Sequence, residues 1–217
     1  MATDAAAIKL HHRLESEDQA RADFYALLAR LYAEAPDAAL LRAIAATPPL
    51  GAATQIEAVG DDAAGLPQAW DMLRAASAAM DADAATDEYN NLFIGVGKSE
   101  VNLHASHWLT GFMMEKPLAE LRSALAAMGL GRKPGSNTLE DHLAALCETM
   151  RILIAGHDDR SPAPVSLQHE YFTRHLVPWV FDCCTAIENN SIANYYRRVA
   201  QFTGSFMALE RDSFAIA

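Results

Sequence analysis

Hydrophobic residues recur at intervals of three and four positions along most of the chain, which is the spacing of one buried face of an α-helix. The clearest case is the stretch SNTLEDHLAALCETMRILIAG, residues 136–156. Its apolar positions are Leu139, Leu143, Leu146, Cys147, Met150 and Ile154. Thr138 and Asp141 fit a capping box, so this helix is expected to begin at Thr138 and to carry Glu140, Asp141 and His142 in its first turn.

The same spacing and the usual start signals predict further helices before and after this one. Expected first residues are Ser16, Asp37, Pro67, Thr86 and Ser166, with a kink or break at Pro117 and a helix N1 position at Pro178. The last helix has Ile192, Tyr195, Val199, Phe202, Phe206 and Leu209 on one face. No segment sustains the apolar and polar alternation of a strand. The prediction is an all-α bundle of about nine to eleven helices.

The segment GLGRKPGSN, residues 129–137, interrupts this helical pattern. Three glycines and a proline within nine residues are typical of a linker. We therefore expect two helical lobes, residues 1–128 and 138–217, joined by a hinge at 129–137. Such a hinge would also permit a homodimer by domain swapping, because a lobe can be exchanged with few new contacts.

Composition and charge narrow the class of protein. The 217 residues are 51% hydrophobic and 21% charged, which is typical of a globular chain with a sizeable core. The net charge is −11, so the basic surface that nucleic-acid binding requires is missing. An acidic surface is compatible with a basic peptide partner.

The three cysteines and the N-terminal sequence indicate a cytoplasmic protein. Cys147, Cys183 and Cys184 form an odd and partly adjacent set, which does not fit a disulfide framework. The N-terminus lacks the basic and apolar regions of a secretory signal. No segment reaches the roughly 20 apolar residues of a membrane span, so no stable membrane insertion is expected.

Three possible chemical sites have weak support in the sequence. The residues Gly97, Lys98 and Ser99 match the end of a phosphate-binding loop motif. The glycine that the motif requires earlier and the β-strand that should precede it are missing. His104 and His107, with Glu100, have a spacing that a helical metal site could use, and a metal-binding protein stays open as an alternative. For nucleophilic catalysis, the fold would have to bring Cys183 next to a base such as His175, and the sequence around them contains no catalytic signature.

Four segments in order resemble the TorD/DmsD family of redox-enzyme maturation chaperones. They are EYNNLFIG (88–95), LRSALAAMGL (121–130), LEDHLAALCETM (139–150) and QHEYFTRHLVPWVFDC (168–183). The most specific elements are the Glu140-Asp141-His142 triplet and the run from His175 to Trp179. The resemblance extends over most of the chain from about Asp23 onward.

The resemblance implies a cytoplasmic, non-enzymatic chaperone without a cofactor. Such proteins bind the twin-arginine leader peptide, the body, or both, of a molybdenum-containing oxidoreductase while its cofactor is inserted. By resemblance, the peptide-binding residues are Leu92, Phe93, Trp108, Glu140, Asp141 and His142. The carboxylates would bind a guanidinium through charge-assisted hydrogen bonds, and the apolar half of the leader would fill a groove by its i, i+3 and i+4 residues.

Some positions depart from the family pattern and leave alternatives open. Leu139 stands where a proline is common, and Gly95-Val96-Gly97 replaces a common Gly-Pro. The stretch EDHLAALCETMRILI is more similar to accessory proteins of formate dehydrogenases than to the trimethylamine-oxide branch. An adaptor that binds only the mature client is an alternative, and so is a purely structural role for the three polar residues.

Overall fold

The computed structural model describes residues 14–51, 65–95, 97–132, 135, 137–157 and 160–216. Within these ranges the chain forms ten α-helices and one π-helix and no β-strand, so the all-α prediction is confirmed. The elements are α1 (Ser16–Ala33), α2 (Ala38–Ala46), α3 (Gly65–Ala79), α4 (Ala82–Tyr89), η1 (Asn90–Ile94), α5 (Ala105–Thr110), α6 (Lys116–Ala127), α7 (Leu143–Ala155), α8 (Val165–His175), α9 (Val180–Asn189) and α10 (Tyr195–Ile216).

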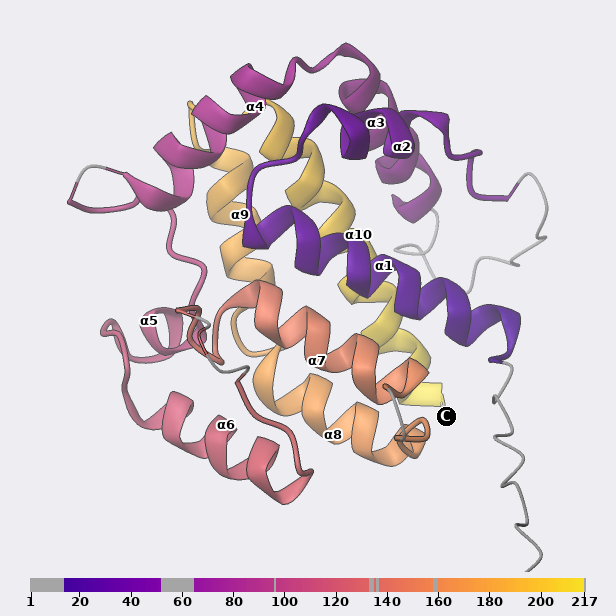
Figure 1. Cartoon of the computed structure of the whole chain (residues 1–217), viewed down its shortest axis with the longest axis vertical. Coiled ribbons are helices and arrows are strands. Elements are labelled where there is room, and N and C mark those ends of the chain that lie inside the picture. The colour runs from indigo at the N-terminus through magenta and orange to yellow at the C-terminus, as the bar shows by residue number, and fades with distance from the viewer. Residues whose placement is uncertain are drawn as a thin grey trace, which may run out of the picture.

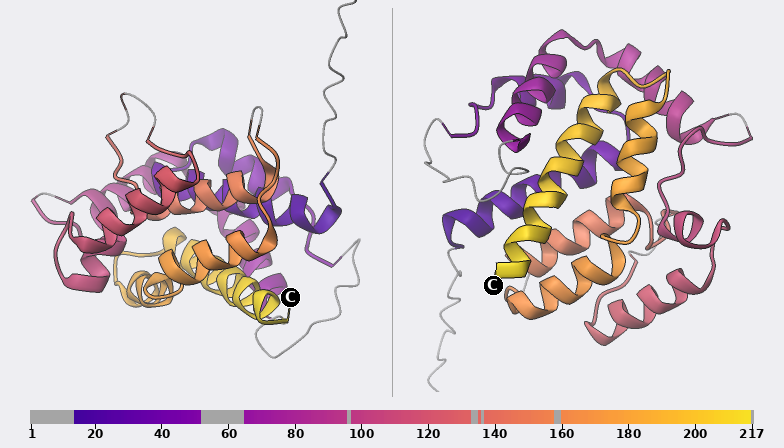
Figure 2. Two further views of the ribbon diagram at one scale, coloured as in Figure 1. Left: turned by 90° about the horizontal axis from the view of Figure 1, so that it is seen from below. Right: turned by 180° about the vertical axis from the view of Figure 1, so that it is seen from behind.

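The helices pack in two layers around one core. Figure 1 shows α1 running alongside α7, which lies beside α8. Helix α10 crosses behind α1 and α7 and packs against α3 and α9, as the rear view in Figure 2 shows. Helix α6 lies at the edge of the molecule in both figures, next to α5. The core is therefore built mainly by α1, α7 and α10, while α6 is peripheral.

Aromatic side chains fill the core, and several of their hydroxyl groups are hydrogen-bonded. The largest fully buried ones are Trp179, Tyr25, Tyr32, Tyr195, Tyr196, Phe172, Phe202 and Phe206. The Tyr32 and Thr203 hydroxyls lie 3.0 Å apart and join α1 to α10. The Tyr196 hydroxyl donates to the Leu31 carbonyl at 3.0 Å, which makes a second link between these helices. These bonds offset the cost of burying the hydroxyl groups.

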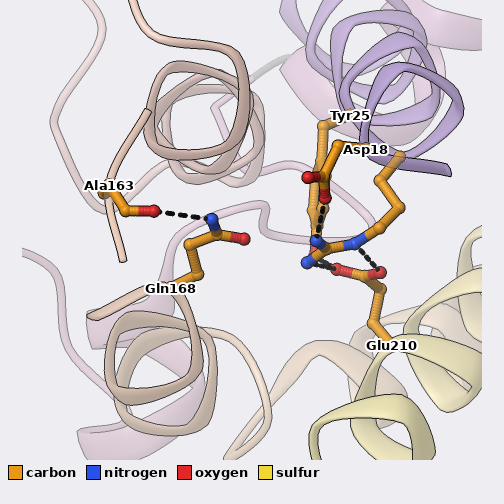
Figure 3. Close-up of polar contacts among 6 residues, drawn as sticks. Asp18, Tyr25, Ala163, Gln168 and Glu210 are labelled. Atoms are coloured by element: carbon orange, nitrogen blue, oxygen red, sulfur yellow. Dashed lines mark hydrogen bonds and ion pairs between the residues drawn. The ribbon is translucent and has the colours of Figure 1, made fainter. Parts of the chain in front are cut away.

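A charged cluster joins the start of α1 to the end of α10 (Figure 3). Arg21 donates from Nε and Nη2 to the two carboxylate oxygens of Glu210, at 2.7 and 3.0 Å. The Tyr25 hydroxyl donates to the same carboxylate at 3.0 Å, and Arg21 Nη1 donates to Asp18 at 2.8 Å. Because Glu210 is buried, these donors compensate for its lost hydration.

Glu88 caps α10 from a distant part of the chain. Its buried carboxylate accepts hydrogen bonds from the backbone N–H groups of Asn194, Tyr195 and Tyr196, at 2.8, 3.0 and 2.8 Å. These are N–H groups that a helix start leaves without an intrahelical partner, and a carboxylate there also suits the helix dipole. Glu88 thereby ties the start of α10 to the end of α4.

Several predicted helix starts are wrong by a few residues. Helix α4 begins at Ala82 and not at Thr86, because the Asp81 side chain caps it by accepting hydrogen bonds from the backbone N–H groups of Asp83 and Ala84. Helix α9 begins at Val180, two residues after Pro178. The Asp37 cap is confirmed by its bond from Leu40 N, and the break near Pro117 separates α5 from α6.

The proposed division into residues 1–128 and 138–217, with a linker at 129–137, stays a prediction. Residues 133, 134 and 136 of that linker lie outside the described residues. Arg160 holds the start of the linker, because its guanidinium donates to the carbonyl groups of Met128 and Gly129. Among the described helices, none has the length and apolar content needed to cross a membrane.

Candidate functional site

The turn before α7 pairs with the segment before α5. Ala105 N donates to the Asp141 carbonyl at 2.9 Å, and Leu143 N donates to the Leu103 carbonyl at 2.8 Å. These bonds form an isolated antiparallel bridge between His104 and His142. The bridge brings two segments that are nearly forty residues apart in sequence into direct contact.

Helix α7 begins at Leu143, so the predicted start at Thr138 is wrong. His142 is the N-cap residue, with an extended backbone, and its Nδ1 accepts from Ala144 N at 3.1 Å. The predicted capping box is also wrong, because the Asp141 side chain accepts from Ser106 on α5. Glu140 and Asp141 therefore lie in a turn ahead of the helix and not in its first turn.

Asp141 is a buried carboxylate with one oxygen left without a hydrogen-bond partner. Its side chain is 1% exposed. Oδ2 accepts from Ser106 N at 3.0 Å and from Ser106 Oγ at 2.5 Å. Oδ1 is buried and has no hydrogen-bond partner within the described part of the chain. A buried acceptor in this state costs free energy, so a donor that reached it would bind favourably.

Asp141 lines a small cavity of about 80 Å³ between α5, α6, α7 and α8. The lining residues are Ala105, Leu109, Pro117, Glu120, Leu121, Asp141, Leu146, Arg174 and His175. Arg174 is exposed, and no hydrogen bond or ion pair joins it to another residue that the structure describes. Burial, together with the nearby Arg174 charge, lowers the pKa of His175 to about 4, so this imidazole is neutral at pH 7.

Glu140 makes an ion pair with α6. Arg122 donates from Nε and Nη2 to Glu140 Oε2, at 3.0 and 2.9 Å. Burial opposes ionisation of Glu140, but the hydrogen bonds and charge of Arg122, together with a backbone hydrogen bond and the charge of Arg132, lower the Glu140 pKa on balance. Because Arg122 is half exposed to solvent, this pair is open to exchange with another cation.

His104 and His142 lie face to edge beside this turn. Their ring centroids are 4.8 Å apart, with an angle of 83° between the rings. Burial and the adjacent His104 lower the pKa of His142 to about 3, and burial also lowers the pKa of His104. Both rings are therefore neutral at pH 7. Within the described ranges, no group of three or more His, Cys, Asp or Glu side chains could hold a metal ion.

The structure separates the predicted peptide-binding residues into two groups. Trp108 lies on α5, two residues after the Ser106 that binds Asp141, and its Nε1 donates to the Asn102 carbonyl at 2.7 Å in the segment that pairs with the turn. Leu92 and Phe93 belong to the aromatic core instead. Leu92 is fully buried, and the Phe93 ring, 9% exposed, packs against Tyr196 with centroids 4.9 Å apart.

Several polar residues around Asp141 and Glu140 could not be found from the sequence. Ser106, Glu120, Arg122 and Arg174 come from three helices and carry no motif of their own. Only the fold shows that they surround Asp141 and Glu140. The alternative of a nucleophilic Cys183 has no support, because complete burial raises the pKa of its thiol well above the usual value and keeps it protonated.

Comparison with known proteins gives one family. The family model described as nitrate reductase delta subunit matches residues 60–185, which is more than half of the chain. The matched region runs from before α3 into α9 and includes the Asp141 cavity. No curated protein matches the chain.

Proposed function

Because the chain belongs to the nitrate reductase delta subunit family, a family of molybdoenzyme chaperones, we propose that it binds the twin-arginine leader of its client. The family match also confirms the resemblance to the TorD/DmsD chaperones. In this proposal the protein holds the leader in the cytoplasm while the molybdenum cofactor is inserted, and it catalyses no reaction.

The observation that carries the proposal is the buried Oδ1 of Asp141, which has no hydrogen-bond partner among the residues that the structure describes. A guanidinium is planar and presents several N–H donors, so it can satisfy a buried carboxylate oxygen better than an ammonium can. Ser106 already holds the other oxygen, which fixes the orientation of the carboxylate. The proposed role of Asp141 is therefore to accept hydrogen bonds from one arginine of the leader.

Glu140 is the proposed acceptor for the second arginine. In the free protein it is paired with Arg122, a guanidinium of the chain itself. A leader arginine would replace Arg122 in an exchange of one guanidinium for another. Trp108 on α5 and His142, which follows Asp141 directly, would border this position, whereas Leu92 and Phe93 lie in the aromatic core and are not part of it.

The client is proposed to be a molybdenum-containing oxidoreductase, with a formate dehydrogenase as the first candidate. The experiment is a fluorescence titration of the protein with labelled leader peptides from the molybdoenzymes of its own organism. We expect saturable binding of one leader, at least tenfold weaker after Arg-Arg is changed to Lys-Lys. Asp141→Asn should weaken binding similarly, whereas Asp182→Asn, an exposed carboxylate on α9, should leave it unchanged.

An adaptor that binds only the mature client is the second candidate, and the family match favours it equally. Deleting the leader from the client separates the two candidates. If every leader peptide fails to bind while the leaderless client still binds, the leader-binding proposal is wrong and the adaptor function replaces it.

A further inference from the structure

The Asp141 carboxylate is closed off from solvent in the free protein. Asp141 is 1% exposed and lines a cavity of about 80 Å³. Helix α6 supplies the outer wall of this cavity through Pro117, Glu120 and Leu121, and it lies at the edge of the molecule in Figure 1. A guanidinium from outside can therefore reach Asp141 only after part of this wall has moved.

The chain can turn on both sides of α6. Gly111, directly after α5, has a φ of 82°, and Gly129, two residues after α6, has a φ of 65°. Glycine adopts left-handed and right-handed backbone angles with similar ease, so rotation at these two residues costs little. At Gly111 the space is also open, since an added Cβ would meet no described atom within 4 Å. Gly111 and Gly129 therefore have the properties of hinge residues.

Met114, between Gly111 and α6, has a strained backbone. Its φ is 59°, in the left-handed region that a residue with a Cβ rarely adopts. Its side chain is 70% exposed, so burial contributes little that would compensate for this strain. A movement of α6 that returns Met114 to an ordinary φ releases the strain. The connection before α6 thus favours a change in the position of the helix.

Two arginines attach α6 to the rest of the protein. Arg122 pairs with Glu140, and Arg160, in the segment between α7 and α8, donates to the carbonyl groups of Met128 and Gly129. Arg160 is exposed and Arg122 is half exposed. Exposed ion pairs and hydrogen bonds contribute little stability, because water competes for the same groups. These attachments can therefore break and form again at low cost.

Helix α5, in contrast, is fixed at the turn before α7, because Ser106 bonds Asp141 from both its N–H and its hydroxyl. The apolar side of α6 consists of Leu118, Leu121 and Leu125, which are buried and favour the closed position. The closed position is therefore the main state, and α6 can leave it while α5 and Asp141 keep their places.

From these observations we propose that α6 is a lid, which swings outward about Gly111 and Gly129 and admits the leader arginine to Asp141. This inference rests on the proposed function, because the lid controls access to the site of that proposal. Arg122 and Arg160 are the two latches of the lid. A leader arginine that takes Glu140 releases the Arg122 latch, so occupancy of Glu140 favours the open lid.

The first test needs no leader. Arg160→Gln removes one latch and leaves the proposed arginine-binding carboxylates in place. Arg74→Gln is the matched control, because Arg74 lies on α3, which is far from α6 in Figure 1. Hydrogen–deuterium exchange measures the opening of α6, and labelling of carboxylates with a carbodiimide and an amine, followed by mass spectrometry, measures the accessibility of Asp141. Circular dichroism checks that both variants are folded.

We expect Arg160→Gln to speed amide exchange in α6 and labelling of Asp141 at least threefold. Exchange in α7 and labelling of the exposed Asp182 should stay within twofold of the wild type, which separates lid opening from general loosening. Arg122→Gln, which removes the other latch, should act in the same direction as Arg160→Gln. Unchanged exchange in α6 and unchanged labelling of Asp141 in both latch variants would overturn the lid, while the leader-binding proposal would still stand.

The second test measures how fast the leader associates. Stopped-flow fluorescence with the labelled leader should give an association rate constant at least threefold higher for Arg160→Gln than for the wild type, and no change for Arg74→Gln. If the lid opens in the first test but the association rate is the same in all three proteins, α6 does not control access to Asp141. If the wild-type protein binds no leader at all, the proposed function fails, and the role of the lid in leader access fails with it.

Discussion

Ser106 ties the first turn of α5 to Asp141 in the turn before α7, through two hydrogen bonds to one carboxylate oxygen. This contact joins segments thirty-five residues apart and holds a carboxylate whose other oxygen accepts no hydrogen bond from the described part of the chain. The position of Asp141 thus depends on a residue that carries no recognisable motif.

Ser106→Ala should therefore destabilise the protein. The variant removes the hydroxyl donor of a buried, charged hydrogen bond, which typically costs about 1.5–3 kcal/mol. The measurement is the free energy of unfolding in urea. Ser123→Ala is the control, because its hydroxyl bonds only to a carbonyl within exposed α6, and it should change the free energy by less than about 0.5 kcal/mol. Equal losses of unfolding free energy in the two variants would mean that the Ser106 hydrogen bond stabilises the fold no more than the exposed Ser123 hydrogen bond does.

The Glu88 cap gives a second stability prediction. Glu88→Gln retains the shape but replaces one acceptor oxygen with an NH₂ group that faces backbone N–H donors. We expect a loss of about 1–3 kcal/mol in the free energy of unfolding. Asp87→Asn, at the exposed neighbouring position, should have little effect. An unchanged unfolding midpoint for Glu88→Gln would contradict the role of this carboxylate in capping α10.

The free energy of unfolding should fall as the pH drops below 6.5. In the folded protein the pKa of His142 is about 3 and that of His175 about 4, against an ordinary value of 6.5. Below pH 6.5 the unfolded chain therefore binds protons that the folded chain does not, which favours unfolding. For His142 alone the loss at pH 5 is about 2 kcal/mol.

His142→Asn tests this pH dependence, because asparagine can keep the N-cap bond to Ala144 N but does not titrate. Unfolding in urea at pH 7 and at pH 5 should show a smaller difference for His142→Asn than for the wild type. If both proteins lose the same stability between these pH values, His142 is not the source of the dependence.

Arg122→Gln should strengthen leader binding, because it frees Glu140 for the second arginine of the peptide. A half-exposed ion pair is worth at most about 1 kcal/mol, so the expected gain in affinity is at most about fivefold. The titration is the same as for the wild type, and Arg74→Gln serves as the control, since Arg74 pairs with Asp71 on α3. Weaker binding by Arg122→Gln would instead mean that Arg122 itself contacts the peptide or holds α6 in place.

The helical class could be predicted from the sequence because each long helix repeats its apolar residues over several turns. The last helix is an example: Tyr195, Val199, Phe202 and Phe206 are all buried in α10 as their spacing predicts. The break at Pro117 and the Asp37 cap were also predictable, because each depends on one residue and its immediate neighbours.

Features that depend on distant contacts could not be predicted. The capping box at Thr138 and Asp141 satisfied the local pattern, but Ser106 binds the Asp141 side chain in the fold. The triplet Glu140-Asp141-His142 was recognised as polar, yet its three members have different environments. Glu140 pairs with Arg122, Asp141 is buried and His142 caps α7.

The central claim is that the Asp141 carboxylate receives an arginine of the leader, and a double-mutant cycle tests it most directly. Wild-type and Asp141→Asn proteins are each titrated with the natural leader and with its Lys-Lys form. We expect Asp141→Asn to weaken binding of the natural leader at least tenfold and binding of the Lys-Lys leader much less, so that the two changes are strongly coupled. Equal and independent losses would contradict a direct contact between Asp141 and the arginine.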